Sequence, residues 1–147
     1  MEFKSEIREK SIRSYVIRAG RMTRAQKQAF DDSWPHYGLK LGDGELDPRQ
    51  TFGKPAPLVV EIGFGMGDSL IKMAENCPDS LFVGIEVYPP GVGRLMKRAH
   101  EMSLKNLRVY MADANDVMEE CIGKKMVDSV INNRLMVAVK KAELTLN

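Results

Sequence analysis

From Leu58 onward, short apolar runs alternate with amphipathic stretches along the chain. Residues 58–62, 81–87 and 107–111 are nearly continuous apolar runs bounded by turn residues, as is typical of buried strands. Residues 126–131 predict a fourth strand. Helical spacing of apolar side chains predicts helices between these strands, over about 68–76, from 89 to beyond Ala99, and over 115–121. Strands that alternate with helices predict an α/β fold, here with a parallel sheet of about four strands and right-handed crossovers.

The chain before Leu58 has a different pattern. Residues 1–22 show no sustained periodicity, and residues 35–57 are rich in glycine and proline, which is typical of loops. Between them, Thr23 and Gln26 fit a capping box, so we expect a short helix that runs to about Ser33 and ends at Trp34-Pro35. Residues 1–57 are therefore predicted to form an N-terminal arm with one short helix and a loop.

Charge is distributed unevenly along the 147 residues. Residues 1–30 carry a net charge of +5, whereas residues 31–122 carry −6. A basic arm favours a polyanionic partner, because contacts with phosphates release counterions, but it is equally consistent with a solvated segment that has no partner.

Composition narrows the class of protein. Apolar residues make up 44% of the chain, yet no run is long enough to span a membrane and the N-terminus lacks the apolar stretch of a signal peptide. The two cysteines, Cys77 and Cys121, lack the spacing of a zinc site. We therefore expect a soluble, cytoplasmic protein without a metal or a disulfide framework.

A glycine-rich loop follows the first predicted strand and opens the first predicted helix. It reads Glu61-Ile-Gly-Phe-Gly-Met-Gly67, so its glycines are Gly63, Gly65 and Gly67. Parallel α/β sheets bind ligands at this edge, and glycines let a ligand approach main-chain N–H groups closely. A dinucleotide site prefers a third glycine or alanine at the position that Asp68 occupies, where a carboxylate would face a pyrophosphate. The pattern instead favours a ligand without a diphosphate.

Two acidic residues lie at or just past the ends of the next two predicted strands, Glu86 at the end of the second and Asp113 just past the third. Glu86 lies where such folds place a carboxylate on ribose hydroxyls, and Asp113 lies where a carboxylate can accept a hydrogen bond from an adenine amine. Taken singly, Glu86 could be a solvated strand end and Asp113 could cap the helix after it. Together with the glycine loop they predict an S-adenosylmethionine site, in which Glu61 positions the loop or meets the cationic methionine group.

Two long runs, residues 60–67 and 84–93, resemble the bacterial tRNA (guanine-N7-)-methyltransferase family. Residues 13–23, Trp34-Pro35, residues 106–109 and Asp113-Ala114 resemble it as well. The resemblance implies a Rossmann-like fold in which the cofactor S-adenosylmethionine contacts Glu61, Glu86, Asp113 and the loop glycines. It also implies that the substrate is tRNA, methylated at N7 of a guanine in the variable loop.

The chain departs from the family after the predicted fourth strand. Family members continue with a Pro-Asp-Pro-Trp segment and a basic cluster, whereas residues 131–135 read Ile-Asn-Asn-Arg-Leu and residues 132–147 show no match. We therefore expect residues 58–131 to be an incomplete Rossmann-like cofactor-binding domain, the first half of the methyltransferase fold. The chain would be C-terminally truncated and weak or inactive alone, and no catalytic residue is assigned.

Two other functions stay open. One is a different S-adenosylmethionine-dependent methyltransferase that acts on a small molecule, and the other is a non-enzymatic fragment that binds RNA or a protein partner. The sequence predicts no oligomeric state.

Overall fold

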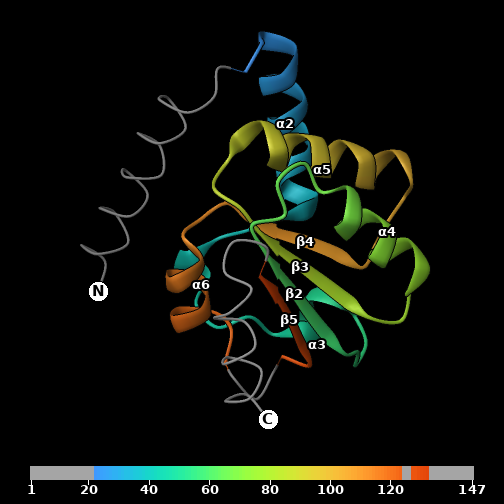
Figure 1. Cartoon of the computed structure of the whole chain (residues 1–147), viewed down its shortest axis with the longest axis vertical. Coiled ribbons are helices and arrows are strands. Elements are labelled where there is room, and N and C mark those ends of the chain that lie inside the picture. Colours follow the sequence, from blue (N-terminus) through green and yellow to red (C-terminus); the bar gives the residue numbers. More distant parts are fainter. Residues whose placement is uncertain (1–21, 124–126, 133–147) are drawn as a thin grey trace.

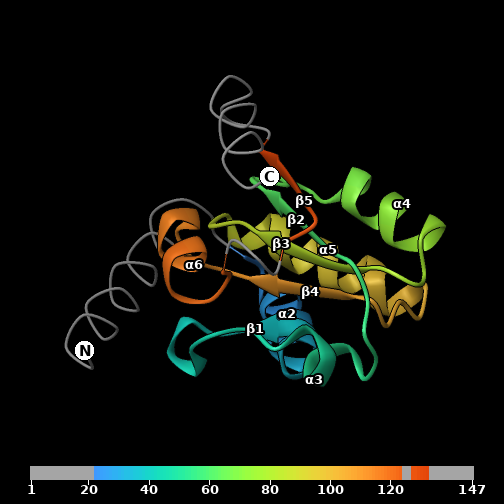
Figure 2. The same cartoon turned by 90° about the horizontal axis from the view of Figure 1, so that it is seen from below.

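A five-stranded, fully parallel sheet forms the centre of the computed structural model, which describes residues 22–123 and 127–132. The strands are β1 (Gly38–Leu39), β2 (Leu58–Ile62), β3 (Leu81–Ile85), β4 (Leu107–Tyr110) and β5 (Ser129–Asn132). Their order across the sheet is β1-β4-β3-β2-β5, so β1 and β5 lie at opposite edges (Figure 2). The predicted α/β class with parallel strands is confirmed, with five strands in place of about four.

Helices cover both faces of the sheet. They are α2 (Arg24–Tyr37), α3 (Pro48–Phe52), α4 (Asp68–Asn76), α5 (Pro89–Glu101) and α6 (Ala114–Glu120), with a 3-10 turn, η1 (Leu41–Asp43), after β1. In Figure 1, α2, α4 and α5 lie on one side of the sheet and α6 lies on the other. None of the described helices is both long and apolar enough to cross a membrane.

Side chains that alternate along the strands divide the core in two. Phe82, Leu107 and Val109 point to the face that packs against α2, α4 and α5. Leu81 and Val83 point to the opposite face, where α6 and the segment around η1 complete the packing. Because β2 and β3 are buried on both faces, their sequences are nearly continuous apolar runs rather than alternating ones.

The two helices nearest the glycine loop follow the predicted pattern. Helix α4 covers the predicted residues 68–76, and α5 begins at Pro89 as expected. The helical spacing of apolar side chains that predicts α5 is confirmed, because Val92, Leu95, Met96 and Ala99 are buried and Met102 packs at the edge of the same core.

The N-terminal helix begins as predicted but does not end as predicted. Both capping-box bonds are present, since the Gln26 N–H donates to Thr23 Oγ1 (3.1 Å) and the Thr23 N–H donates to Gln26 Oε1 (2.9 Å). The helix then continues through Trp34-Pro35 to Tyr37. Pro35 lies in the last turn, where it removes a single helical hydrogen bond. Burial of Tyr37 in the core favours the longer helix, and its hydroxyl donates to the Leu104 carbonyl (3.4 Å).

Residues 35–57 are also more ordered than the predicted loop. They contain β1, η1 and α3, and β1 pairs with β4 through Gly38 opposite Val109 and Leu39 opposite Tyr110. The sheet therefore includes residues that the sequence assigned to the arm. The expectations for residues 1–21 and 133–147, including most of the basic arm and the unmatched tail, lie outside the described residues. The division into 1–57, 58–131 and 132–147 stays a prediction.

Candidate cofactor site

The glycine loop joins the carboxyl end of β2 to the first turn of α4. Gly63, Gly65 and Gly67 have φ angles of 71°, 63° and 86°, in the left-handed region that residues with a Cβ rarely adopt. The loop is fixed at both ends, because the Gly63 N–H donates to the Ile85 carbonyl (2.8 Å) and the Gly67 N–H donates to the Phe64 carbonyl (3.0 Å). The predicted loop therefore has a defined backbone at the edge of the sheet where such folds bind ligands.

Glu86 contacts this loop directly. It follows β3, is 5% exposed, and accepts a hydrogen bond through Oε1 from the Gly65 N–H (3.0 Å). Its Oε2 accepts from the N–H groups of Val87 (2.7 Å) and Tyr88 (3.3 Å). The interpretation of Glu86 as a solvated strand end is therefore wrong. Since a carboxylate can accept about four hydrogen bonds, these three bonds are compatible with one more from a ligand hydroxyl.

Glu61 lies on β2 and is almost fully buried, at 1% exposed. Its Oε1 accepts a hydrogen bond from Ser69 Oγ (3.0 Å), which ties β2 to the first turn of α4 across the glycine loop. In the sheet, Glu61 pairs with Gly84 on β3 and with Ile131 on β5. A buried carboxylate is tolerated only with partners, and this one holds the helix start beside the loop. Its predicted contact with a cofactor stays a prediction.

Asp113 is the N-cap of α6, the simpler of its two predicted roles. Its Oδ1 accepts hydrogen bonds from the N–H groups of Asn115 (2.9 Å) and Asp116 (3.4 Å). The side chain is exposed and follows the end of β4, on the same edge of the sheet as Glu86. Because both bonds use Oδ1, capping is compatible with a bond from Oδ2 to an adenine amine, which stays a prediction.

Helix α5 encloses the loop from the side. Arg94 Nη2 lies 3.2 Å from Asp68 Oδ1, at the start of α4, and Leu95 packs against Gly67. The ion pair is more than two-fifths exposed on both sides, so it contributes little to stability. The site residues predicted from the sequence include neither Arg94 nor any other residue of α5, because nothing local shows that this helix returns to the loop.

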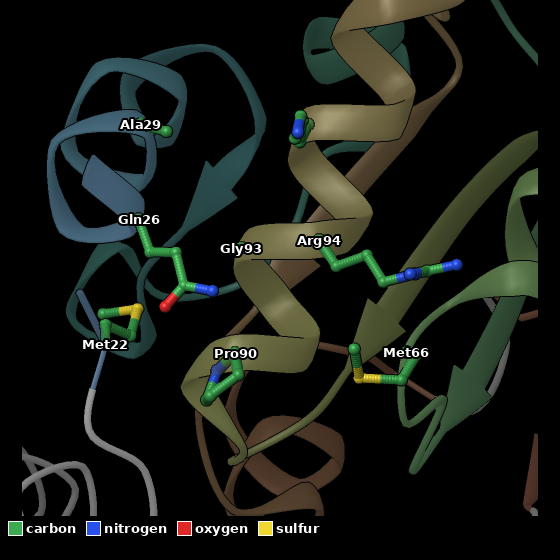
Figure 3. Close-up of a pocket in the computed structure, with 8 residues that line it drawn as sticks. Met22, Gln26, Ala29, Met66, Pro90, Gly93 and Arg94 are labelled. Carbon is green, nitrogen blue, oxygen red and sulfur yellow. The ribbon is translucent and has the colours of Figure 1, made fainter.

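An open groove of about 260 Å³ runs beside the loop, between α2 and α5 (Figure 3). Its lining combines apolar side chains with Gln26, Arg94 and Lys97; the apolar members are Met22, Ala29, Met66 and Pro90. Figure 3 shows Met66 of the glycine loop beneath Arg94, with Gln26 on the other side of α5. Met66 is 43% exposed, which is unusual for a large apolar side chain in this structure. The groove therefore offers a cationic rim next to the candidate site.

Of the two cysteines, Cys77 is exposed and Cys121 is buried. Cys121 is fully buried, and burial raises the pKa of its thiol, so no thiolate is available at neutral pH. Burial also raises the pKa of Tyr110 beside it. No three His, Cys, Asp or Glu side chains gather as a metal site within residues 22–123 and 127–132. The chemistry of this edge is that of backbone N–H groups and carboxylates.

Known proteins match this region. A family model described as "Putative methyltransferase" matches residues 55–133, which begin just before β2 and end just after β5. The match therefore includes the glycine loop, Glu86 and Asp113.

Three relatives carry the name tRNA (guanine-N(7)-)-methyltransferase. The protein from Saccharophagus degradans is 62% identical over 84% of this chain and 54% of its own length. Those from Marinobacter nauticus and Stutzerimonas stutzeri are 49% and 44% identical, each over 83% of this chain and 51% of their own lengths. These relatives confirm the resemblance inferred from the motifs. The chain spans about half the length of the curated relatives it matches.

Proposed function

This chain belongs to the putative methyltransferase family whose model matches more than half of it, and from that premise we propose that it binds S-adenosylmethionine for methyl transfer to tRNA. The proposed acceptor is N7 of a guanine in the variable loop, in agreement with the names of its relatives. Residues 58–131 would supply the cofactor-binding part of this activity. A tRNA substrate also favours a cytoplasmic location.

The contact between Glu86 and Gly65 is the observation that carries the proposal. It brings a buried carboxylate, which can accept hydrogen bonds from ribose hydroxyls, against a glycine loop whose backbone at Gly65 has open space on the side where a Cβ would lie. Asp68 at the start of α4 disfavours a diphosphate there. The residues present therefore fit a nucleoside with a small charged tail.

The chemistry requires little beyond positioning. When bound, S-adenosylmethionine supplies a methyl group on a positively charged sulfur. N7 of guanine has a free lone pair, so no general base is needed, and alignment of the two reactants provides most of the rate. Glu86 and the glycine loop would orient the nucleoside, while Glu61 and Ser69 hold the start of α4 in place. We assign no catalytic residue within the described part of the chain.

Titration calorimetry on the full chain tests the cofactor. We expect S-adenosylmethionine to bind with a dissociation constant below about 1 mM, and a nicotinamide dinucleotide to bind far more weakly because of Asp68. Absence of binding at millimolar S-adenosylmethionine would exclude an active enzyme and favour the RNA- or partner-binding alternative. Transfer of labelled methyl groups to tRNA supports the proposed acceptor, whereas transfer only to small metabolites favours the other methyltransferase class.

The groove between α2 and α5 is the surface that we propose for tRNA. Its rim carries Arg94 and Lys97 beside the glycine loop, and the polar Gln26 faces it from α2 (Figure 3). Cationic side chains that contact phosphates give RNA affinity that falls with salt. A phosphate backbone lying here would pass next to the bound cofactor.

Lys97→Ala is expected to weaken tRNA binding at every salt concentration and to reduce the slope of log affinity against log salt by about 1. Lys105→Ala is the matched control, since Lys105 is also exposed but precedes β4, at the amino ends of the strands and away from the glycine loop. Filter binding of the full chain to bulk tRNA measures both. Equal slopes for the two variants would place the RNA elsewhere.

A further inference from the structure

The glycine loop is held in place by a second glycine on another helix. Gly91 is the third residue of α5 and is buried. A Cβ built on Gly91 would overlap with the carbonyl oxygen of Gly65 and would lie 3.0 Å from its carbonyl carbon. Ordinary contacts between non-bonded heavy atoms are about 3.5–4.0 Å. Because the neighbour is backbone and not the end of a flexible side chain, any residue other than glycine at position 91 must displace the loop or the helix.

The peptide groups of Gly65 are therefore restrained from two sides. The N–H of Gly65 donates to Glu86 Oε1 (3.0 Å), and its carbonyl lies against Gly91. Residue 65 has no side chain of its own to fix its left-handed conformation. Its position is thus set by the end of β3 on one side and by the start of α5 on the other.

Two further contacts extend the same interface. A Cβ at Gly67 would lie 2.5 Å from Leu95 Cδ1, so Leu95 packs directly over the loop backbone. One residue before Leu95, Arg94 pairs with Asp68 just beyond the loop. The first two turns of α5 thus contact the loop at residues 65, 67 and 68.

We propose that Gly91 is a positioning residue for the cofactor loop: by letting α5 approach the Gly65 carbonyl, it sets the place of the loop backbone against which S-adenosylmethionine would lie. The proposal rests on the proposed function, because it concerns the same cofactor site. It assigns to α5 a role that the strand-end motif alone does not suggest.

The competing explanation is that Gly91 merely allows tight packing and so stabilises the fold. Gly93 provides a matched control on the same helix. A Cβ at Gly93 would meet only Phe30 Cδ2 at 3.5 Å, an ordinary contact. Glycine-to-alanine changes at both positions gain similar helix propensity, so a difference between them reflects the contact with the loop.

The test compares Gly91→Ala and Gly93→Ala in the full chain. By titration calorimetry, we expect Gly91→Ala to weaken S-adenosylmethionine binding about tenfold or more, and Gly93→Ala to stay within about twofold of the wild type. Circular dichroism measures the folded fraction, so that affinity is compared between folded proteins. Equal affinities for both variants would overturn the proposal.

A second measurement needs no cofactor. In nitrogen–proton correlation spectra, the amide resonance of Gly65 is expected to shift in Gly91→Ala and to stay in place in Gly93→Ala. An unmoved Gly65 resonance in Gly91→Ala would overturn the positioning role even if the wild type bound no cofactor. Failure of the wild type to bind S-adenosylmethionine would instead contradict the proposed function, so the two failures are distinguishable.

If Gly91→Ala does not fold, the test uses a second pair of variants, with Leu95→Ala as the test and Leu107→Ala as its control. Both leucines are buried in the same core and lose the same side-chain atoms on substitution by alanine, but only Leu95 packs over a loop glycine. We expect reduced cofactor affinity for Leu95→Ala alone. Equal affinities in this pair would overturn the proposal.

Discussion

Glu86→Ala is expected to weaken binding of S-adenosylmethionine by about 1–3 kcal/mol, or roughly 5- to 150-fold. The substitution removes the carboxylate that is proposed to accept hydrogen bonds from the ribose hydroxyls. It also removes the acceptor that holds the Gly65 N–H and, through Oε2, those of Val87 and Tyr88. Titration calorimetry at neutral pH measures the effect, with the melting temperature recorded on the same samples.

Two variants separate the role of Glu86 from a general effect of charge. Glu86→Gln keeps one carbonyl oxygen for the Gly65 N–H but loses the negative charge, so we expect an intermediate loss. Glu75→Ala removes an exposed carboxylate from α4 on the side away from the loop and should leave affinity unchanged. If Glu86→Ala bound the cofactor as well as Glu75→Ala does, Glu86 would not be a cofactor ligand.

Asn106→Ala is expected to lower the free energy of unfolding by about 2–3 kcal/mol. Asn106 is 4% exposed, and the two N–H groups of its Nδ2 are shared among the carbonyls of Ala74 (2.9 Å), Cys77 (3.0 Å) and Ser80 (3.1 Å). The Ala74 carbonyl belongs to the last turn of α4, where no helical N–H remains to bond it. Alanine would leave these carbonyls without this donor at a site that water reaches poorly.

Urea unfolding followed by circular dichroism measures the loss. Asn115→Ala is the control, since Asn115 is exposed on α6, and such surface changes usually stay within about 0.5 kcal/mol. We expect the denaturant dependence to be similar in both variants, so that the midpoint reports stability. A loss for Asn106→Ala no larger than that for Asn115→Ala would show that the three carbonyls find other donors.

The elements that could be predicted are those whose signals are local and repeated. The predicted strand over 58–62 and helix over 68–76 agree with the structure at both ends. The third strand and the last helix differ by one residue at their ends. Each of these segments combines an apolar run or helical spacing with clear breaks on both sides, so short-range pattern and burial point to the same answer.

The misjudged elements depend on distant partners. Strand β1 has two residues and exists because β4, far along the chain, pairs with it. Trp34-Pro35 stays helical because packing of Tyr37 and Trp34 against the core outweighs one lost hydrogen bond. Helix α3 is a different case, because its start at Asp47-Pro48 and its end at Gly53 carry local helix signals. It was missed because a helix of five residues is too short to show a periodic pattern.

The candidate site divides in the same way. The glycine loop and Glu86 could be identified from their places at strand ends, and the structure brings them within hydrogen-bond distance. The roles of Gly91 and Asn106 could not be identified from the sequence, because each depends on contacts with carbonyl groups far away along the chain. Gly91 contacts the carbonyl of a residue 26 positions earlier, and the carbonyls bound by Asn106 are at least 26 positions earlier. A spacing motif identifies the loop and the strand before it, whereas the helix that packs against the loop, here α5, can be identified only from the structure.

The strand order also indicates the order in which the strands can pair during folding: the three inner strands pair over short separations, and the two edge strands over long ones. Strand β2 pairs with β3 and β3 pairs with β4 through residues about 25 positions apart, whereas Gly38 pairs with Val109 and Val59 with Ser129, about 70 positions apart. Closing a loop about three times longer costs about 1 kcal/mol more in chain entropy. Contacts between distant residues also slow folding. Strand β1 therefore gains its partner only after β4 has been synthesised, and β2, an inner strand of the finished sheet, remains an edge until β5 pairs with it.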